Sequence, residues 1–243
     1  TVTQTTNGTV DVSLRDGVNF FVLQPGEIDA SLSFVKAGPA ILGLTKANTF
    51  TGTTTLAGGT LRLAYATDES MLADGAELIL NDGILDLAGS VAHTEVVGST
   101  TLNGTVATER SAGSAIINLG AITRNAGSLR ISEDGIAMTS NPNVGGILGG
   151  WATVGSSFAT NDGAGVIVGL QVFEQDISRL SGGGPHSIAD GAADNVRIFE
   201  DGDTVSPITM AASGVTTINS LLQAADGANA TPTASVIDIG AGN

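Results

Sequence analysis

The chain has 243 residues and no cysteine, and its 9 basic and 24 acidic residues give a formal net charge of -15. The acidic excess repels polyanions, which excludes nucleic acid and anionic lipid as expected partners. The lack of cysteine excludes disulfides, zinc-thiolate sites and thiol nucleophiles. Hydrophobic residues make up 42% and aromatic residues only 4%, while 34 residues are glycine. A core of small aliphatic side chains between glycine turns favours short strands over long helices.

Short runs in which apolar and polar residues alternate recur along the chain between glycine turns. Period-two alternation is the pattern of a half-buried strand. The predicted strands lie at 9–14, 60–63, 77–80, 84–87, 116–119, 129–131, 166–168, 196–199, 218–221 and 236–239. Asp-Gly pairs, which tolerate the positive φ of tight turns, lie at 74–75, 82–83, 134–135, 162–163, 201–202 and 226–227. No apolar run approaches the roughly 18 residues that a membrane span needs, so we expect no membrane insertion.

The spacing of these strands favours stacked coils over a Greek-key sandwich, because the strands recur irregularly and their cores are small and β-branched. We therefore predict an all-β fold, a parallel β-helix or β-solenoid with about twenty residues per coil. It forms a single continuous domain over 1–243, with the Gly/Asn-rich stretch 139–164 as a boundary or loop region. The predicted core residues are Leu61, Leu63, Leu78, Leu80, Leu85, Leu87, Ile117, Leu119, Leu129 and Ile131.

A repeat motif lies at residues 44–63, which read LTKANTFTGTTTLAGGTLRL, and residues 83–87 read GILDL. These runs resemble the autotransporter-associated β-strand repeat, whose pattern is approximately L-T-x-x-N-T-Y/F-T-G-x-T-x-V/L-x-x-G-T-L-x-L followed by G-x-L-D-L. Residues 149–153, 158–159, 165–167 and 217–221 also resemble segments of large surface proteins that carry this repeat. The resemblance implies a right-handed parallel β-helix that is secreted and displayed at the cell surface or in the extracellular space.

Histidine chemistry is not predicted. The two histidines, His93 and His186, lie in polar, Gly/Ser-rich surroundings without a G-x-S-x-G elbow or a second histidine at metal-binding spacing. We therefore expect no catalytic residue and no enzyme, and we expect that replacing either histidine by alanine leaves folding and activity unchanged.

Carboxylates are the better candidates for chemistry, because many polysaccharide-cleaving β-helices use acidic pairs. Asp86 and Asp238 lie within predicted strands, and a dense acidic cluster comprises Asp190, Asp194, Glu200, Asp201 and Asp203. Sugar-cleaving grooves usually carry aromatic platforms, but this chain has only one Trp, one Tyr and seven Phe, so solubility explains the acids more simply. Asp201 and Asp203 are weak candidates for calcium, since neither an EF-hand nor a glycine-rich nonapeptide motif is present. No other cofactor is expected.

The predicted function is architectural. We expect an extracellular structural protein that forms or decorates a surface layer, sheath or filament by self-association. Residues 1–14 provide a possible assembly or exchanged strand, in which Val10, Val12 and Leu14 would contact the edge of another copy. One alternative is an adhesin or phage-type fibre that binds surface polysaccharide, and a second is a polysaccharide-acting β-helix enzyme. For the architectural function, the expected partner is another copy of the protein itself.

Overall fold

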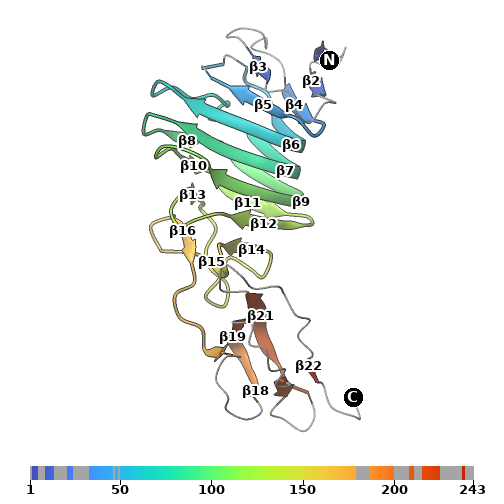
Figure 1. Ribbon diagram of the computed structural model, residues 1–243, viewed down its shortest axis with the longest axis vertical. Coiled ribbons are helices and arrows are strands. Elements are labelled where there is room, and N and C mark those ends of the chain that lie inside the picture. Colours follow the sequence, from blue (N-terminus) through green and yellow to red (C-terminus); the bar gives the residue numbers. More distant parts are fainter. Residues whose placement is uncertain are drawn as a thin grey trace.

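The computed structural model describes residues 2–4, 9–13, 21–23, 33–45, 47–48, 50–178, 186–199, 208–210, 215–224 and 237–238. All regular elements in these residues are β-strands, and none is a helix. No helix in this part of the chain is therefore long and apolar enough to cross a membrane. Parallel strands stack turn upon turn into a β-solenoid of about seven turns (Figure 1). The predicted all-β solenoid is confirmed.

The main stack contains two sheets. The principal sheet comprises β1 (Val2–Gln4), β2 (Thr9–Ser13), β3 (Phe21–Leu23), β4 (Ser33–Ala37), β5 (Ile41–Leu44), β6 (Thr54–Tyr65), β7 (Glu77–Gly89), β9 (Ser99–Arg110), β11 (Ala121–Arg124), β12 (Ser128–Ile131), β14 (Ala152–Val154), β15 (Ser157–Asn161) and β16 (Ile167–Gly169). The flank sheet comprises β8 (Thr94–Val96), β10 (Ile116–Asn118) and β13 (Ala137–Met138). Ile41 pairs with Thr60, Thr54 with Leu78 and Glu77 with Ser99, so successive turns take about 19 to 24 residues.

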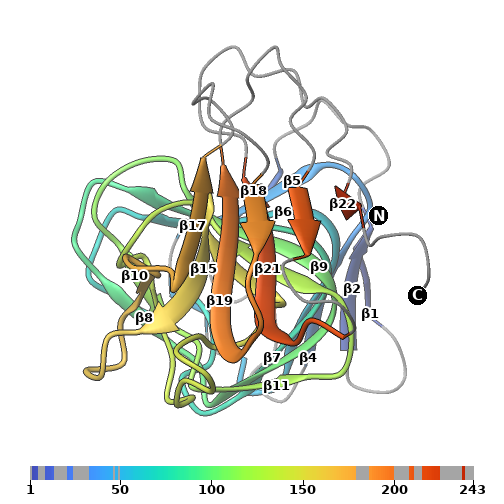
Figure 2. The same ribbon diagram turned by 90° about the horizontal axis from the view of Figure 1, so that it is seen from below.

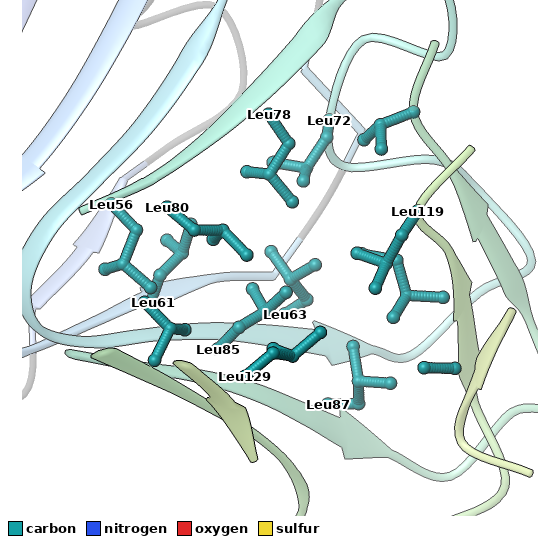
Figure 3. Close-up of a cluster of buried hydrophobic side chains, with 14 of the residues drawn as sticks. Leu56, Leu61, Leu63, Leu72, Leu78, Leu80, Leu85, Leu87, Leu119 and Leu129 are labelled. Atoms are coloured by element: carbon teal, nitrogen blue, oxygen red, sulfur yellow. The ribbon is translucent and has the colours of Figure 1, made fainter. Parts of the chain in front are cut away.

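The core is a set of aliphatic columns inside the main stack. Because successive turns are in register, Leu61 lies against Leu85 and Leu63 against Leu87. Figure 3 shows these leucines pointing from facing strands into one interior. All ten residues that the alternation pattern predicted to be buried are 0 or 1% exposed. Burial of each such side chain contributes about 1.5–3 kcal/mol, which makes these columns the main source of stability.

The predicted Asp82–Gly83 turn is wrong, because both residues lie inside β7. The strand bends there, with a register shift between Leu80 and Asp82 and a φ of 111° at Gly83. A coil corner redirects the strand sideways while its parallel hydrogen bonds continue, whereas a hairpin turn would reverse it. The Asp-Gly pairs at 74–75 and 134–135 do form turns, and those at 201–202 and 226–227 lie outside the described residues.

Antiparallel pairs close both ends of the principal sheet. At the N-terminal end β1 pairs with β2 in antiparallel fashion, and β2 then pairs with β4 in parallel. At the other end β14, β15 and β16 form an antiparallel meander. The Gly/Asn-rich stretch 139–164 holds β14 and β15, so it lies where parallel stacking ends.

A second, smaller stack follows. Its sheets are β17 (Gln175–Ser178), β19 (Gly191–Phe199) and β21 (Ile218–Ala224), and β18 (His186–Ile188), β20 (Ile208–Met210) and β22 (Ile237–Asp238). All these pairs are parallel, and Ile177, Ile188, Val196 and Ile198 form a core of their own. Figure 2 shows these strands side by side across the end of the main stack.

The joint between the two stacks is partly apolar and partly polar. Ile147, Phe158 and Phe173 form a buried cluster against which Leu170 and Leu222 pack. The Arg197 guanidinium lies 4.7 Å from the centre of the Phe173 ring. Two amides of the second stack, those of Asn195 and Asn219, donate to the Gly145 carbonyl at 2.9 and 3.2 Å.

Candidate functional site

The predicted assembly strand is paired within its own chain. Val10 is in register with Phe34 of β4 and with Gln4 of β1, and Val12 with Lys36 and Val2. The expectation of a free strand at 9–14 is therefore corrected, because β2 has a partner on each side. Leu14 lies outside the described residues.

The predicted calcium candidates Asp201 and Asp203 also lie outside the described residues. Two other members of that acidic cluster are described, and each accepts hydrogen bonds from nearby groups. Asp190 accepts from the Thr217 amide at 2.7 Å, and Asp194 accepts from the Gln175 side chain at 2.7 Å. The described part of the chain holds no group of three or more His, Asp or Glu side chains arranged for a metal ion.

Asp86, a carboxylate considered for sugar cleavage, joins three successive turns. It is 3% exposed and accepts a hydrogen bond from Arg62 Nε at 2.5 Å in the turn before. Its other oxygen accepts the Ser111 amide at 3.1 Å in the turn after. Both oxygens are therefore engaged by neighbouring turns. The side chain of Asp238, the other strand carboxylate, is not described.

A buried acidic residue lies on the flank of the main stack. Glu95 is the middle residue of β8 and is in register with Ile117, which is in turn in register with Ala137. All three are 0% exposed, so Glu95 occupies a core column in which the next two turns carry apolar side chains. An ionisable group at such a position needs several partners, because burial of a charge in a low-dielectric core is costly.

Glu95 finds its partners in the preceding turn. That turn has no strand beside β8, and instead passes the flank as residues 66–73, which we call the corner loop. The amides of Met71 and Leu72 donate to the Glu95 carboxylate at 3.0 and 2.9 Å. The Tyr65 hydroxyl, also buried, donates to it at 2.8 Å. The carboxylate thus accepts hydrogen bonds from two backbone amides of the corner loop. If the corner loop were a strand, these amides would pair with a neighbouring strand instead.

His93 lies between this buried carboxylate and an exposed one. Its Nδ1 is 2.7 Å from Asp68 Oδ1 on the corner loop, and its Nε2 is 3.6 Å from Glu95 Oε2. The His93 side chain is 7% exposed, whereas that of Asp68 is 77% exposed. The imidazole also packs on the Tyr65 ring, with the ring centres 4.6 Å apart. Replacement of His93 is consequently expected to cost stability, contrary to the expectation from sequence.

Two open clefts lie on either side of the corner loop. One of about 500 Å³ is lined by Asp68, Ala92, His93, Thr94, Ser114 and Ile116. The other, of about 510 Å³, is lined by part of the corner loop, by residues 74–76 and by Asn48, Phe50 and Thr51. Ser114, His93 and Asp68 line the same cleft, but they do not form a nucleophilic triad. The imidazole nitrogen that would activate the serine is buried and faces Glu95.

The surroundings of this cluster favour the uncharged forms of its acids. Burial raises the pKa of Glu95, and the amides of Met71 and Leu72, the Tyr65 hydroxyl and the nearby His93 offset part of that rise. Burial and the Glu95 carboxylate raise the pKa of Tyr65, so this phenol stays protonated and acts as a donor. The cluster is therefore a small acid–base network that reaches solvent through Asp68.

A second buried ionisable side chain, Lys36, lies at a corner near the N-terminal end. Its Nζ donates to the carbonyl oxygens of Ala37, Gly38 and Gly58 at 3.0, 2.8 and 2.7 Å. Burial lowers the pKa of Lys36 to about 8. The ammonium group satisfies three carbonyls from two turns, which is a structural use of the charge.

Sequence reasoning did not identify Glu95 or its partners. The alternation around residues 93–97 gave one available signal, since it places His93, Glu95 and Val97 on the same side of a strand. Comparison of the chain with protein-family models, with curated proteins and with solved structures gave no match.

Proposed function

We propose that the chain is an extracellular structural protein that builds or decorates a surface layer, sheath or filament by self-association. The observation that carries this proposal is how the described polar side chains are used. Many of them bind a neighbouring turn of the solenoid. Asp86 joins three turns, and Lys36 holds carbonyls of two. An arrangement of this kind strengthens a rod.

A ladder of asparagines supports the same interpretation. The Asn103 amide donates to Asn81 at 2.9 Å, and the Asn125 amide donates to Asn103 at 2.9 Å. These three residues lie on successive turns and are linked along the stacking direction. Each such bond contributes about 0.5–1.5 kcal/mol, and the ladder gains from repetition along the rod.

Self-association has a candidate edge in the second stack. Among the described strands, β21 pairs with β19 alone. Val196 of β19 is 0% exposed, while Leu221, its register partner in β21, is 38% exposed. A further strand stacked on β21 would cover Leu221, and a second copy can supply one. The resemblance of residues 44–63 to a passenger repeat of surface proteins supports a location outside the cell.

Sedimentation velocity and negative-stain microscopy test this proposal. We expect larger species as protein concentration rises, and more of them at high salt, because the net charge of -15 makes copies repel one another. Leu221→Lys places a charge at the edge and should reduce association. Ala112→Lys, at an exposed corner of the main stack, is the matched control and should associate like the wild type.

Two results would contradict the proposal. A wild-type protein that stays monomeric at every concentration and salt level removes self-association. Release of reducing sugar from a surface polysaccharide, lost in a variant of one acidic residue, would establish an enzyme instead.

A further inference from the structure

We propose that Asp68, His93 and Glu95 form a proton-controlled latch that holds the corner loop, residues 66–73, against the flank of the solenoid. This inference is independent of the proposed function. It rests on an exposed carboxylate that contacts an imidazole at 2.7 Å, and on the far nitrogen of that imidazole, which lies 3.6 Å from a fully buried carboxylate.

Two polar attachments of the loop depend on this series, in addition to the burial of the Met71 and Leu72 side chains in the core and the bond of the Asn48 amide to the Met71 carbonyl. At one point Glu95 accepts the amides of Met71 and Leu72. At the other, Asp68 contacts His93 Nδ1. A change in the charge of the imidazole or of the buried carboxyl group alters both attachments together. Residues 66, 67 and 69 of the corner loop are exposed, whereas Met71 and Leu72 pack in the main core.

Charge balance decides when the latch is closed. A protonated imidazole donates from both nitrogens, so it satisfies a carboxylate on each side. A neutral imidazole carries one proton, and one carboxylate then faces a lone pair. In the buried pair, Nε2 has no hydrogen-bond partner in the described part of the chain and lies 3.6 Å from Glu95 Oε2. When the His93–Glu95 pair binds one proton more than a neutral imidazole and a carboxylate hold, Glu95 is either neutral or faces a positive imidazolium. The core then contains no uncompensated charge.

Few titratable or charged groups face the His93–Glu95 pair. The end of β6 contributes Tyr65, the corner loop contributes Asp68, and β8 contributes Glu95 itself. The following turn contributes Ser114 and Ile116 to the cleft, and neither titrates in the physiological range. The pair therefore has no described cation near it that would replace the proton.

The direction of the pH effect follows from Glu95. Burial raises the pKa of Glu95 above its ordinary value of 4.5, so the latched state binds a proton more readily than an open state in which Glu95 is hydrated. The latch is consequently stable at mildly acidic pH and weakens as the pH rises through the raised pKa. Because the loop forms a wall of both clefts, opening it changes the shape of each.

Amide hydrogen exchange of Met71 and Leu72 in the whole chain tests the latch. After correction for the intrinsic rate, we expect exchange to be slower at mildly acidic pH than at higher pH, because the raised pKa of Glu95 makes the latched state bind a proton more readily. Glu95→Gln keeps the shape of the side chain and removes its charge, so this dependence should disappear. Glu69→Gln, the same exchange on an exposed part of the loop, should retain it.

Two outcomes overturn the proposal. The first is wild-type exchange at Met71 and Leu72 that does not change with pH, a result that needs no variant to fold. The second is a pH dependence in Glu95→Gln equal to that of the wild type.

Discussion

Replacement of Gly127 by alanine tests how closely the corners of successive turns are stacked. Gly127 has a φ of 72°, and a Cβ there would overlap the carbonyl group of Gly104 in the turn before. Gly163 has a φ of 94°, but a Cβ there would meet no atom within 4 Å. The two positions share an unfavourable φ for alanine and differ in space, so Gly163→Ala is the matched control.

The magnitude follows from the hydrogen bonds at that corner. An alanine in left-handed backbone costs about 1–2 kcal/mol, and this is the whole cost expected for Gly163→Ala. In Gly127→Ala the turns must also separate by about 1 Å of their spacing of about 4.8 Å. That movement breaks the bonds of the Asn125 and Ala126 amides to the Leu102 carbonyl, now 2.8 and 3.2 Å long. At about 1 kcal/mol each, the total for Gly127→Ala is about 3–4 kcal/mol.

Urea denaturation of the wild type and both variants measures these free energies of unfolding. Gly127→Ala should lose about 2 kcal/mol more than Gly163→Ala, the value of the two broken bonds. Equal losses would show that the corner has room for a methyl group, and the argument from close stacking would then be wrong.

Three further predictions concern the core, the joint and the buried lysine. Leu85→Ala should lower the free energy of unfolding by about 3 kcal/mol, because it leaves a cavity in a filled column. Val172 is 74% exposed, so Val172→Ala should stay within about 0.5 kcal/mol of the wild type. Equal effects in urea denaturation would contradict the core assignment. Phe173→Ala removes the ring that packs on Phe158 and Arg197, so limited proteolysis should cut between the two stacks faster than in Val172→Ala, and unchanged cleavage would show that the joint does not depend on this ring. Burial lowers the pKa of Lys36 from 10.5 to about 8, so the unfolded chain binds more protons between these values and stability should rise with pH across that window. Lys36→Met should flatten that rise in thermal melts, and a rise of the same size in the variant would assign it to another group.

The sequence was most informative where local pattern alone decides the structure. Leu85 and Leu87 alternate with polar residues, and alternation fixes which side chains of a strand share a face, so their burial was predictable. Asp82–Gly83 was read as a turn because the same pair serves hairpins and coil corners alike. Only the neighbouring turn, whose hydrogen bonds continue through the bend, distinguishes the two.

The candidate site was beyond sequence reasoning for a different reason. Glu95 takes a core position because the turn before it lacks a strand, and that absence depends on how residues 66–73 cross the flank. Nothing in the local pattern pairs Glu95 with amides 23 or 24 residues earlier. The contact between the two stacks could not be predicted from the sequence either. Phe158 and Phe173 come together only after the β14–β16 meander has folded.

The repeated turn of about 19 to 24 residues also has a consequence for how such a chain changes in length. Each turn contacts the one before and the one after, so a gene that gains or loses a segment of this size restores every column without altering the rest. The rod then grows or shortens in steps of about 4.8 Å. Selection acts on inward-facing aliphatic residues and on the corner glycines, and leaves outward positions free to diverge. Duplicated turns can therefore keep the same shape long after their sequences have ceased to look alike.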